Sequence, residues 1–384
     1  MSDVLFEIKK ENLETGLRGY PSGYCMTSSV VPEKGLFYRG HPVNELALKT
    51  PEEVIYILYH GKEGSKKEME AFSKDIASRS KCSQETLSAI RNLPRKGHAM
   101  ALFSAAILVA GMVEGKNDYR EDCLDLIAKI PEIAATVINH HAGWGNGPLS
   151  DPSLGYIENF VNMLNIPGKK SDKLVDVFKF FDILHFDHGG GNLCTFVGKA
   201  IASGLEDMYG SISGAMCALA GPRHGKANQD SLEFIDRLVK ELGEDISESD
   251  LEKAIRKKLA NKELIYGFGH AVLRVEDPRA TMFYEMADKN FKDNPYIKMT
   301  KKLREVVPGI LKENEKIQDP YPNVDAISGS VLAAAGFNYP QYFTVLFGVS
   351  RTVGIAIQIV YERLIAREGK GLPIVRPKYI YKEK

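Results

Sequence analysis

Apolar side chains recur at three- and four-residue spacing along most of this chain, and no other feature constrains its fold as strongly. Such spacing gathers them on one face of an α-helix, and that face must be buried against other helices. The clearest examples cover residues 121–141, 172–186, 192–208, 230–245, 248–262 and 351–369. We therefore predict a mainly α fold.

Strand signals are few and short. Apolar and polar residues alternate only near residues 3–8, 23–39 and 374–381, so we expect minor short β segments there. Pro51 followed by two glutamates, with Gly61 as a stop, marks one well-capped helix. The most apolar run, residues 100–113, is too short to span a bilayer, which needs roughly 18 to 20 residues. We interpret it as a helix buried inside the protein or between subunits.

The length of the chain, 384 residues, favours one large domain and a smaller one, because a single core rarely grows to this size. Gly221, Gly225 and the loop 336–340 bracket a charge-rich amphipathic block. We predict that residues 227–336 form the small domain, and that residues 1–226 and 337–384 form the large one.

Composition excludes several classes of function. The 50 Lys and Arg balance the 50 Asp and Glu, whereas a nucleic-acid surface needs a basic excess. The five cysteines are widely spaced without a CxxC pair, which favours neither disulfides nor a zinc site and fits a reducing compartment. The N-terminal segment lacks the patterns of a signal or transit sequence, so we expect a cytoplasmic protein without a membrane anchor.

Histidines, arginines and an aspartate gather in predicted loops of the C-terminal half. Histidine titrates near neutral pH and arginine binds planar carboxylates with two hydrogen bonds, so the set indicates a site for anionic substrates with acid–base machinery. The segments are LHFDHGGGN (184–192), AGPRHGKAN (220–228), YGFGHAVLRVEDPR (266–279), YPNVDAISG (321–329), FGVSR (347–351) and VRPK (375–378).

Other interpretations of these segments are weaker. His188 before three glycines is similar to an esterase oxyanion loop, but no GxSxG elbow exists, and Ile212 occupies the serine position of GSISG. His185 and His188 lack further ligands that would complete a metal site, so none is expected. GFGHAV has Val272 where a dinucleotide fingerprint requires its third glycine.

Single residues also have simpler interpretations. Asp325, taken alone, is better interpreted as a helix N-cap than as a base. Any one arginine is more often a surface residue, although Arg351 opens an otherwise apolar helix. His98, His140 and His141 lack a chemical context and are interpreted as structural or exposed.

Together these segments resemble the signature loops of the citrate synthase family. LHFDHGGGN, LAGPRHGKANQ, GFGHAVLR followed by DPR, PYPNVDAISG and LFGVSR have the family's order. RNLPRKGHAMALFSAAI and YREDCLDLIAKIPEIAA are also similar, so the resemblance spans residues 14–378 approximately. GHAVLR and NVDAISG are closer to mitochondrial-type enzymes than to GHRVYK-type bacterial forms.

The resemblance implies a citrate-synthase-like, almost wholly helical homodimer. Both termini would lie in the large domain, and the small domain would close over the substrates. The implied reaction joins acetyl-CoA, a co-substrate, to oxaloacetate and water, giving citrate and CoA without a permanently bound cofactor. By position, Asp325 would be the base, His224 would stabilise the enol, and His270 would be the acid at the oxaloacetate carbonyl.

The resemblance also implies which residues bind the substrates. His188, Arg279 and Arg351 would bind oxaloacetate, together with Arg376 of the partner subunit. Phosphate contacts and the adenine-binding backbone of residues 267–272 would hold CoA. The implied CoA-binding residues are Arg274, Lys316, Gly267, Gly269, Ala271, Val272, Asn323 and, as a weaker candidate, Arg18.

Some features depart from the family pattern. Tyr266 replaces a common proline, and Ile327 replaces a histidine of the mitochondrial-type enzymes, so either could alter the acyl-CoA pocket. The segment 114–122 is short, so a CoA-contacting arginine expected there is not transferred. No N-terminal regulatory β-domain is visible, so NADH control is not expected.

Two alternatives stay open. 2-Methylcitrate synthase uses propionyl-CoA with the same catalytic residues, and one methylene in an apolar pocket is worth only about 1 to 3 kcal/mol. A binding protein on this scaffold would need no turnover, but the intact trio of His224, His270 and Asp325 argues against it.

Overall fold

The computed structural model describes residues 4–383, most of which are helical. The first half holds α1 (Val43–Leu46), α2 (Pro51–His60), α3 (Lys66–Arg79), α4 (Gln84–Arg91), α5 (Ala99–Glu114), α6 (Tyr119–Ala142) and α7 (Tyr156–Met163). The second half holds α8 (Leu174–His185), α9 (Leu193–Ala202), α10 (Met208–Leu219), α11 (Ala227–Leu242), α12 (Glu248–Ala260), α13 (Pro278–Asn290), α14 (Pro295–Lys312), α15 (Ser328–Ala334) and α16 (Phe343–Leu364). Short 3₁₀ turns are η1 (Lys10–Glu14), η2 (Val324–Ala326) and η3 (Pro340–Tyr342). The predicted mainly α class is confirmed.

Helix α2 illustrates how local sequence sets these boundaries. The hydroxyl of Thr50 accepts the backbone N–H of Glu53 at 3.3 Å, and the Glu53 carboxylate accepts the N–H of Thr50 at 2.7 Å. Pro51 occupies the first turn, where a missing N–H costs nothing. Gly61 ends the helix with φ 76°, a conformation that side chains disfavour. The predicted helix between Pro51 and Gly61 is therefore confirmed.

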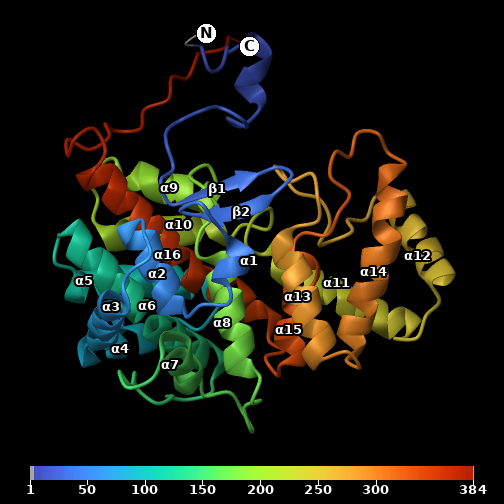
Figure 1. The fold of residues 1–384 in the computed structure, drawn as a ribbon, viewed down its shortest axis with the longest axis horizontal. Coiled ribbons are helices and arrows are strands. Elements are labelled where there is room, and N and C mark those ends of the chain that lie inside the picture. Colours follow the sequence, from blue (N-terminus) through green and yellow to red (C-terminus); the bar gives the residue numbers. More distant parts are fainter. Residues whose placement is uncertain (1–3, 384) are drawn as a thin grey trace.

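One small antiparallel sheet crosses the top of the helical body (Figure 1). It contains β1 (Ser28–Val31), β2 (Gly35–Tyr38) and β3 (His41–Pro42) in that order. Ser28 pairs with Tyr38, and Phe37 pairs with Pro42. The strand signal at residues 23–39 is thus confirmed over β1 and β2.

The strands expected near both ends of the chain were wrong predictions. No strand occurs in residues 4–8 or 374–381 of the described chain. Alternation needs a hydrogen-bonded neighbour to become a strand, whereas both terminal segments project from the body (Figure 1). Their apolar side chains are exposed, as in Leu5 (83%) and Tyr379 (92%).

Helix α16 forms the centre of the main core. It packs against α6, α8, α9 and α10, and nearly all its side chains are buried. The stretch Pro340–Leu364 is long and apolar enough for a membrane span, but 94% of its most apolar window is buried inside the protein. The apolar side chains of this helix are therefore buried against the neighbouring helices of the protein (Figure 1).

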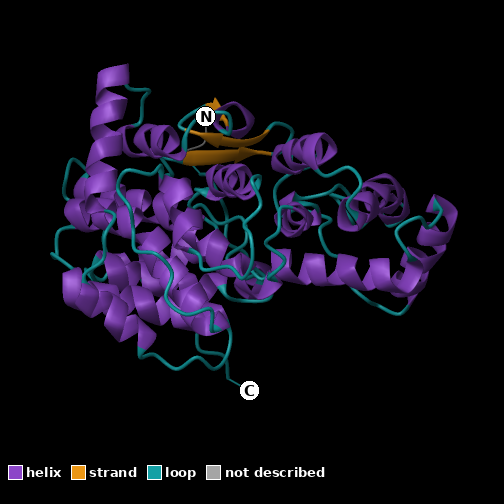
Figure 2. Ribbon diagram, turned by 90° about the horizontal axis from the view of Figure 1, so that it is seen from below, coloured by secondary structure: helices purple, strands orange, loops and turns teal. Residues whose placement is uncertain are grey.

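A second, smaller hydrophobic cluster joins α11, α12 and α14, which lie together on one side of the molecule (Figures 1 and 2). Its buried members are Phe234, Ile235, Leu238, Leu251, Ile255, Met299, Leu303, Val307, Ile310 and Leu311. Helices α13 and α15 pack instead into the main core, through residues such as Phe283 and Val331. The assignment of residues 227–336 to one small domain stays a prediction.

Helix α5, the most apolar run, is buried on one side only. Phe103 and Ile107 are fully buried, whereas Leu108 and Met112 are 40% and 77% exposed. The run was expected to lie inside the protein or between subunits; one side of the helix packs inside the protein, and the place of the exposed side stays a prediction.

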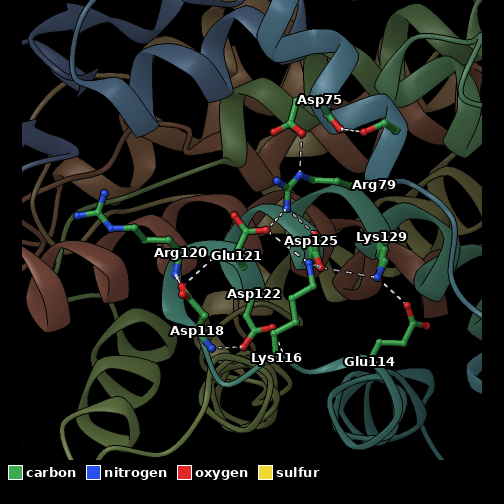
Figure 3. Close-up of polar contacts among 11 residues, drawn as sticks. Asp75, Arg79, Glu114, Lys116, Asp118, Arg120, Glu121, Asp122, Asp125 and Lys129 are labelled. Carbon is green, nitrogen blue, oxygen red and sulfur yellow. Dashed lines mark hydrogen bonds and ion pairs between the residues drawn. The ribbon is translucent and has the colours of Figure 1, made fainter.

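Charged side chains link α3, α5 and α6 (Figure 3). Arg79 bridges Asp75, Glu121 and Asp125 at 2.7 to 2.9 Å, and Lys129 pairs with Glu114 at 2.6 Å. The Asp122 carboxylate accepts the backbone N–H groups of Lys116 and Asp118, which closes the short turn before α6. This network anchors residues 114–122, the connection between α5 and α6.

Candidate active site

His224 lies in the turn between α10 and α11 and is held by a backbone amide. The N–H of Cys194, in the first turn of α9, donates to His224 Nε2 at 3.3 Å. That nitrogen must accept, so a neutral ring carries its proton on Nδ1. Burial, followed by the charge of Arg351, lowers the pKa of His224 to about 4. His224 is therefore a neutral hydrogen-bond donor at neutral pH.

His270 has the opposite tautomer. Its Nδ1 accepts the backbone N–H groups of Val272 at 3.0 Å and Leu273 at 2.9 Å, which leaves the proton on Nε2. Burial, followed by the charge of Arg279, lowers the pKa of His270 to about 4. The two imidazoles thus offer N–H groups from opposite sides of the ring.

The G-x-G turn brings the His270 loop against η2. Gly267 and Gly269 have φ 84° and 86°, which side chains disfavour. A Cβ on Gly267 would lie 2.5 Å from the Cα of Ala326. The carbonyl of Gly267 accepts the N–H of Asn323 at 2.9 Å, and the side-chain amide of Asn323 donates to the carbonyl of Gly269 at 2.8 Å. Glycine is required here for this close approach of two backbones.

Asp325 lies in η2, and its carboxylate does not cap a helix. The N-cap position of α15 is Ile327, without a side-chain cap, and η2 is capped by Asn323, whose side-chain oxygen accepts the N–H of Asp325 at 3.0 Å. The N-cap interpretation of Asp325 is therefore wrong. Burial raises the pKa of Asp325 to about 6, while Arg279 and the side chain of Asn228 oppose the rise. Such a carboxylate is ionised at neutral pH and is more basic than an exposed aspartate.

Two buried arginines provide positive charge. Arg279, 4% exposed, pairs with Asp277 at 2.7 Å. Arg351, 1% exposed, donates from Nε to the carbonyl of His185 at 3.1 Å and lies over the Phe347 ring at 4.8 Å. Within residues 4–383 the Nη1 atom of Arg351 is buried without a hydrogen-bond partner. An unpaired buried donor is costly, so this nitrogen suits an anionic ligand.

His188 lies beside His270, with ring centroids 5.4 Å apart. Its backbone N–H donates to the buried Asp187 carboxylate at 2.8 Å, and the side chains of Thr27 and Gln358 donate to the same carboxylate. Burial, together with Arg279 and Arg351, lowers the pKa of His188 well below its usual value.

The structure therefore gathers the predicted reaction centre from five separate segments. Arg279 acts electrostatically on His188, His270 and Asp325, and Arg351 acts on His188 and His224. Sequence reasoning missed the supporting groups Asp187, Cys194 and Asn228. Asp187 lies between His185 and His188 in the sequence, and this position could have been used to find it. A backbone N–H such as that of Cys194 cannot be recognised from sequence.

The residues expected to bind CoA are placed differently. Arg274 donates to the carbonyls of Val272 and Leu273 and to the side chain of Gln318. Ala271 and Val272 are exposed at the edge of the His270 loop. Lys316 is exposed as well.

Arg18 and Arg376 are exposed near the two ends of the chain, outside the buried centre. Neither forms an ion pair in the part of the chain that the structure describes.

The three histidines that the sequence leaves without a chemical context, His98, His140 and His141, have structural hydrogen bonds. His98 caps α5 by accepting the N–H of Met100, and its other ring nitrogen contacts Gln229 at 3.1 Å. His140 contacts the carbonyl of Leu93 at 2.9 Å, and His141 contacts the hydroxyl of Tyr342 at 3.0 Å. Among residues 4–383, no group of three or more His, Cys, Asp and Glu side chains is arranged to hold a metal ion.

The departures from the family pattern lie in packed positions. Ile327 is fully buried in the main core. Tyr266 packs on Phe234 of the small cluster, with ring centroids 5.9 Å apart. Both side chains contribute to packing beneath the loops.

Comparisons with known proteins agree with this architecture. Residues 16–378 match the family described as citrate synthase, C-terminal domain. Citrate synthase 4, mitochondrial, of Arabidopsis thaliana is 37% identical over 389 residues, which cover 95% of this chain and 80% of that protein. The peroxisomal citrate synthase of Saccharomyces cerevisiae is 34% identical over 100% of this chain and 86% of its own length.

Solved structures show the same fold. Citrate synthase from Thermotoga maritima superposes with a TM-score of 0.81 at 28% identity, covering 96% of this chain and 95% of that one. The ternary complex of carboxymethyl coenzyme A and oxaloacetate with citrate synthase from Thermoplasma acidophilum gives 0.83 at 26% identity, covering 96% of both chains. With the family match spanning nearly its whole length, the chain belongs to the citrate synthase family of acyltransferases.

Proposed function

We propose that this chain condenses acetyl-CoA with oxaloacetate and water to give citrate and free CoA. The observation that carries the proposal is a half-buried carboxylate of raised pKa, Asp325, and two half-buried, neutral histidine donors around two buried arginines. The Thermoplasma relative supports it, because that enzyme was solved with a CoA derivative and oxaloacetate together.

The first step removes a proton from the acetyl methyl group. Asp325 accepts this proton while the Nδ1–H of His224 donates to the thioester oxygen, which becomes an enol. The methyl group is too weakly acidic for a carboxylate alone, so a preorganised donor must stabilise the developing charge. Neutral His224 fits this role, since burial keeps its pKa at about 4.

The second step forms the carbon–carbon bond. The enol carbon attacks the oxaloacetate carbonyl, and the Nε2–H of His270 protonates the oxygen as it becomes an alkoxide. His188, Arg279 and Arg351 bind the oxaloacetate carboxylates. Water then cleaves the citryl thioester to release citrate and CoA, so the thioester must be shielded until the bond has formed. Closure of the small domain, residues 227–336, supplies this shielding.

The proposed active enzyme is a homodimer, in which Arg376 of the partner subunit completes the oxaloacetate site. The exposure of Arg376 and the exposed apolar side chains of α5 support this arrangement. Mixing an Arg376→Ala chain with an Arg351→Ala chain should restore part of the activity in hybrid dimers. Verified heterodimers without activity would place Arg376 in the site of its own subunit.

Thiol release tests the reaction. A thiol-reactive dye follows free CoA formed from acetyl-CoA or propionyl-CoA, each with and without oxaloacetate. Oxaloacetate-dependent release supports the condensation, and the ratio of the two kcat/KM values decides between citrate and 2-methylcitrate. Absence of release from both thioesters would favour a binding protein on the same scaffold.

A further inference from the structure

We infer that the small sheet holds the oxaloacetate-binding loop in place, with Asp187 and Thr27 as positioning residues that fix His188. This inference rests on the proposed function, in which His188 binds oxaloacetate. Thr27 directly precedes β1, and Asp187 directly precedes His188 in the loop after α8. The reaction steps described above use neither positioning residue.

Side-chain oxygens hold three successive N–H groups of this loop. The N–H of Asp187 donates to the hydroxyl of Tyr38 at 3.2 Å, and the N–H of His188 donates to the Asp187 carboxylate at 2.8 Å. The N–H of Gly189 donates to the hydroxyl of Ser28 at 2.7 Å. Tyr38 belongs to β2 and Ser28 to β1, so the sheet supplies two of the three acceptors. These bonds fix a backbone that lies outside regular secondary structure.

The Asp187 carboxylate joins this backbone to two further segments. It is fully buried, and it accepts hydrogen bonds from the hydroxyl of Thr27 and from the side-chain amide of Gln358, on α16, the latter at 2.9 Å. Burial raises the pKa of Asp187, and the bond from the Thr27 hydroxyl opposes the rise. A buried carboxylate stays ionised only where hydrogen-bond donors replace its water. The hydroxyl of Thr27 therefore stabilises the charge that holds the His188 backbone.

Helix α16 confines Asp187 from the other side. The N–H of Gly354 donates to the carbonyl of Phe186 at 3.0 Å. A Cβ on Gly354 would lie 2.4 Å from the carbonyl oxygen of Phe186 and 2.7 Å from the Cβ of Asp187. The backbone of α16 thus touches the loop directly, and Asp187 is enclosed between this helix and the sheet.

The hairpin of β1 and β2 also reaches the segment that carries Arg279. The N–H of Arg274 donates to the carbonyl of Pro32, which directly follows β1, at 2.9 Å. A Cβ on Gly35, the first residue of β2, would lie 2.5 Å from the Cγ of Pro278, the residue before Arg279. One hairpin therefore contacts both sides of the proposed oxaloacetate site.

The test uses Thr27→Val, which keeps the shape of the side chain and removes the hydroxyl. The buried carboxylate then lacks one donor, and the loop that it holds can shift. Calorimetry and thiol release, both with the full-length protein, should show Kd and KM for oxaloacetate raised by about tenfold, as expected for one hydrogen bond to a charged group. KM for acetyl-CoA should stay unchanged. Thr27→Ser, which keeps the hydroxyl, should restore both oxaloacetate constants.

Thr86→Val is the matched control. Thr86, on α4, is also fully buried, and its hydroxyl also donates to a carboxylate, that of Glu114. This variant should lower thermal stability and leave both oxaloacetate constants unchanged.

Unchanged oxaloacetate constants in folded Thr27→Val overturn the inference, as does a Thr27→Ser chain that is equally impaired. If Thr27→Val does not fold, Asp187→Asn answers the same question. Its neutral amide accepts hydrogen bonds more weakly than a carboxylate, so both constants should rise, and constants equal to those of the wild type overturn the inference. A wild-type chain that binds oxaloacetate without releasing thiol overturns the proposed condensation alone, whereas one that binds no oxaloacetate overturns both.

Discussion

The two halves of the proposed site differ in how firmly the protein holds them. On the oxaloacetate side, Arg279 and Arg351 are buried, and His188 is tied to the buried Asp187. On the CoA side, Lys316 is exposed, and Ala271 and Val272 lie exposed at a loop edge. The first half is preorganised for a small anion, whereas the exposed side chains of the second half must be ordered by the ligand.

This difference follows from the chemistry that each half performs. A small dicarboxylate is held only if several charges are fixed in position. Burial strengthens the electrostatic interaction of each of those charges with the ligand. A long nucleotide tail can be bound through weak contacts with exposed cations. Substitutions on the buried side should therefore have larger effects than substitutions on the exposed side.

Asp325→Asn should have the largest effect. The amide cannot accept the methyl proton, and a positioned general base contributes about 10²- to 10⁴-fold to the rate. We expect kcat to fall by this range while oxaloacetate still binds, as measured by thiol release and by calorimetry. Turnover close to that of the wild type would remove Asp325 from the role of base.

Arg351→Leu should lower kcat/KM for oxaloacetate by about 30-fold or more, since losing one buried charged hydrogen bond costs about 2 kcal/mol or more. Arg363→Leu is a matched control, because Arg363 is also buried on α16 and bonds the carbonyl of Leu372. The control should lower thermal stability and leave KM for oxaloacetate unchanged. Equal kinetic losses in both variants would contradict the proposed role of Arg351.

The pH profile of the wild-type enzyme should show one acidic limb. Asp325 acts in its ionised form and has a pKa of about 6, so kcat/KM should fall about tenfold per pH unit below pH 6. His224 and His270, with pKa values of about 4, stay neutral through this range. A second limb between pH 5 and 8 that disappears in a histidine variant would contradict their neutral state.

Lys316→Ala should have the smallest effect. An exposed ion pair is worth about 1 kcal/mol or less, so KM for acetyl-CoA should rise by about fivefold at most, and less at high salt. Lys257→Ala is the control, because it also removes an exposed lysine, this one on α12. It should leave KM for acetyl-CoA unchanged. A loss as large as that of Arg351→Leu would end the contrast between a preorganised and a ligand-ordered half.

Much of the fold follows from sequence, because helical periodicity and capping are local. Pro51 and Gly61 bounded α2 as predicted, since both act through their own backbone. The strands predicted near residues 3–8 and 374–381 were wrong predictions, because alternation of apolar and polar residues does not reveal whether a neighbouring strand exists. Terminal strands require tertiary information that a local pattern lacks.

The candidate site was predictable to a similar extent. Motifs identified the histidines and arginines, but local rules could not choose between Asp325 and Asn323 as a cap, because both residue types cap well. The choice is made by the Gly267 turn, which binds the backbone of Asn323 from a distant segment. The contact of the Cys194 backbone with His224 was invisible for the same reason, since the two residues lie 30 positions apart in the sequence.

The backbone donors to the two histidines have a consequence for mutation. Main-chain N–H groups of Cys194, Val272 and Leu273 set which nitrogen of each ring carries the proton. A substitution at these positions changes the side chain but keeps the N–H, unless the new residue is proline. The protonation pattern of the reaction centre therefore does not depend on which side chain, other than that of proline, stands at these three positions.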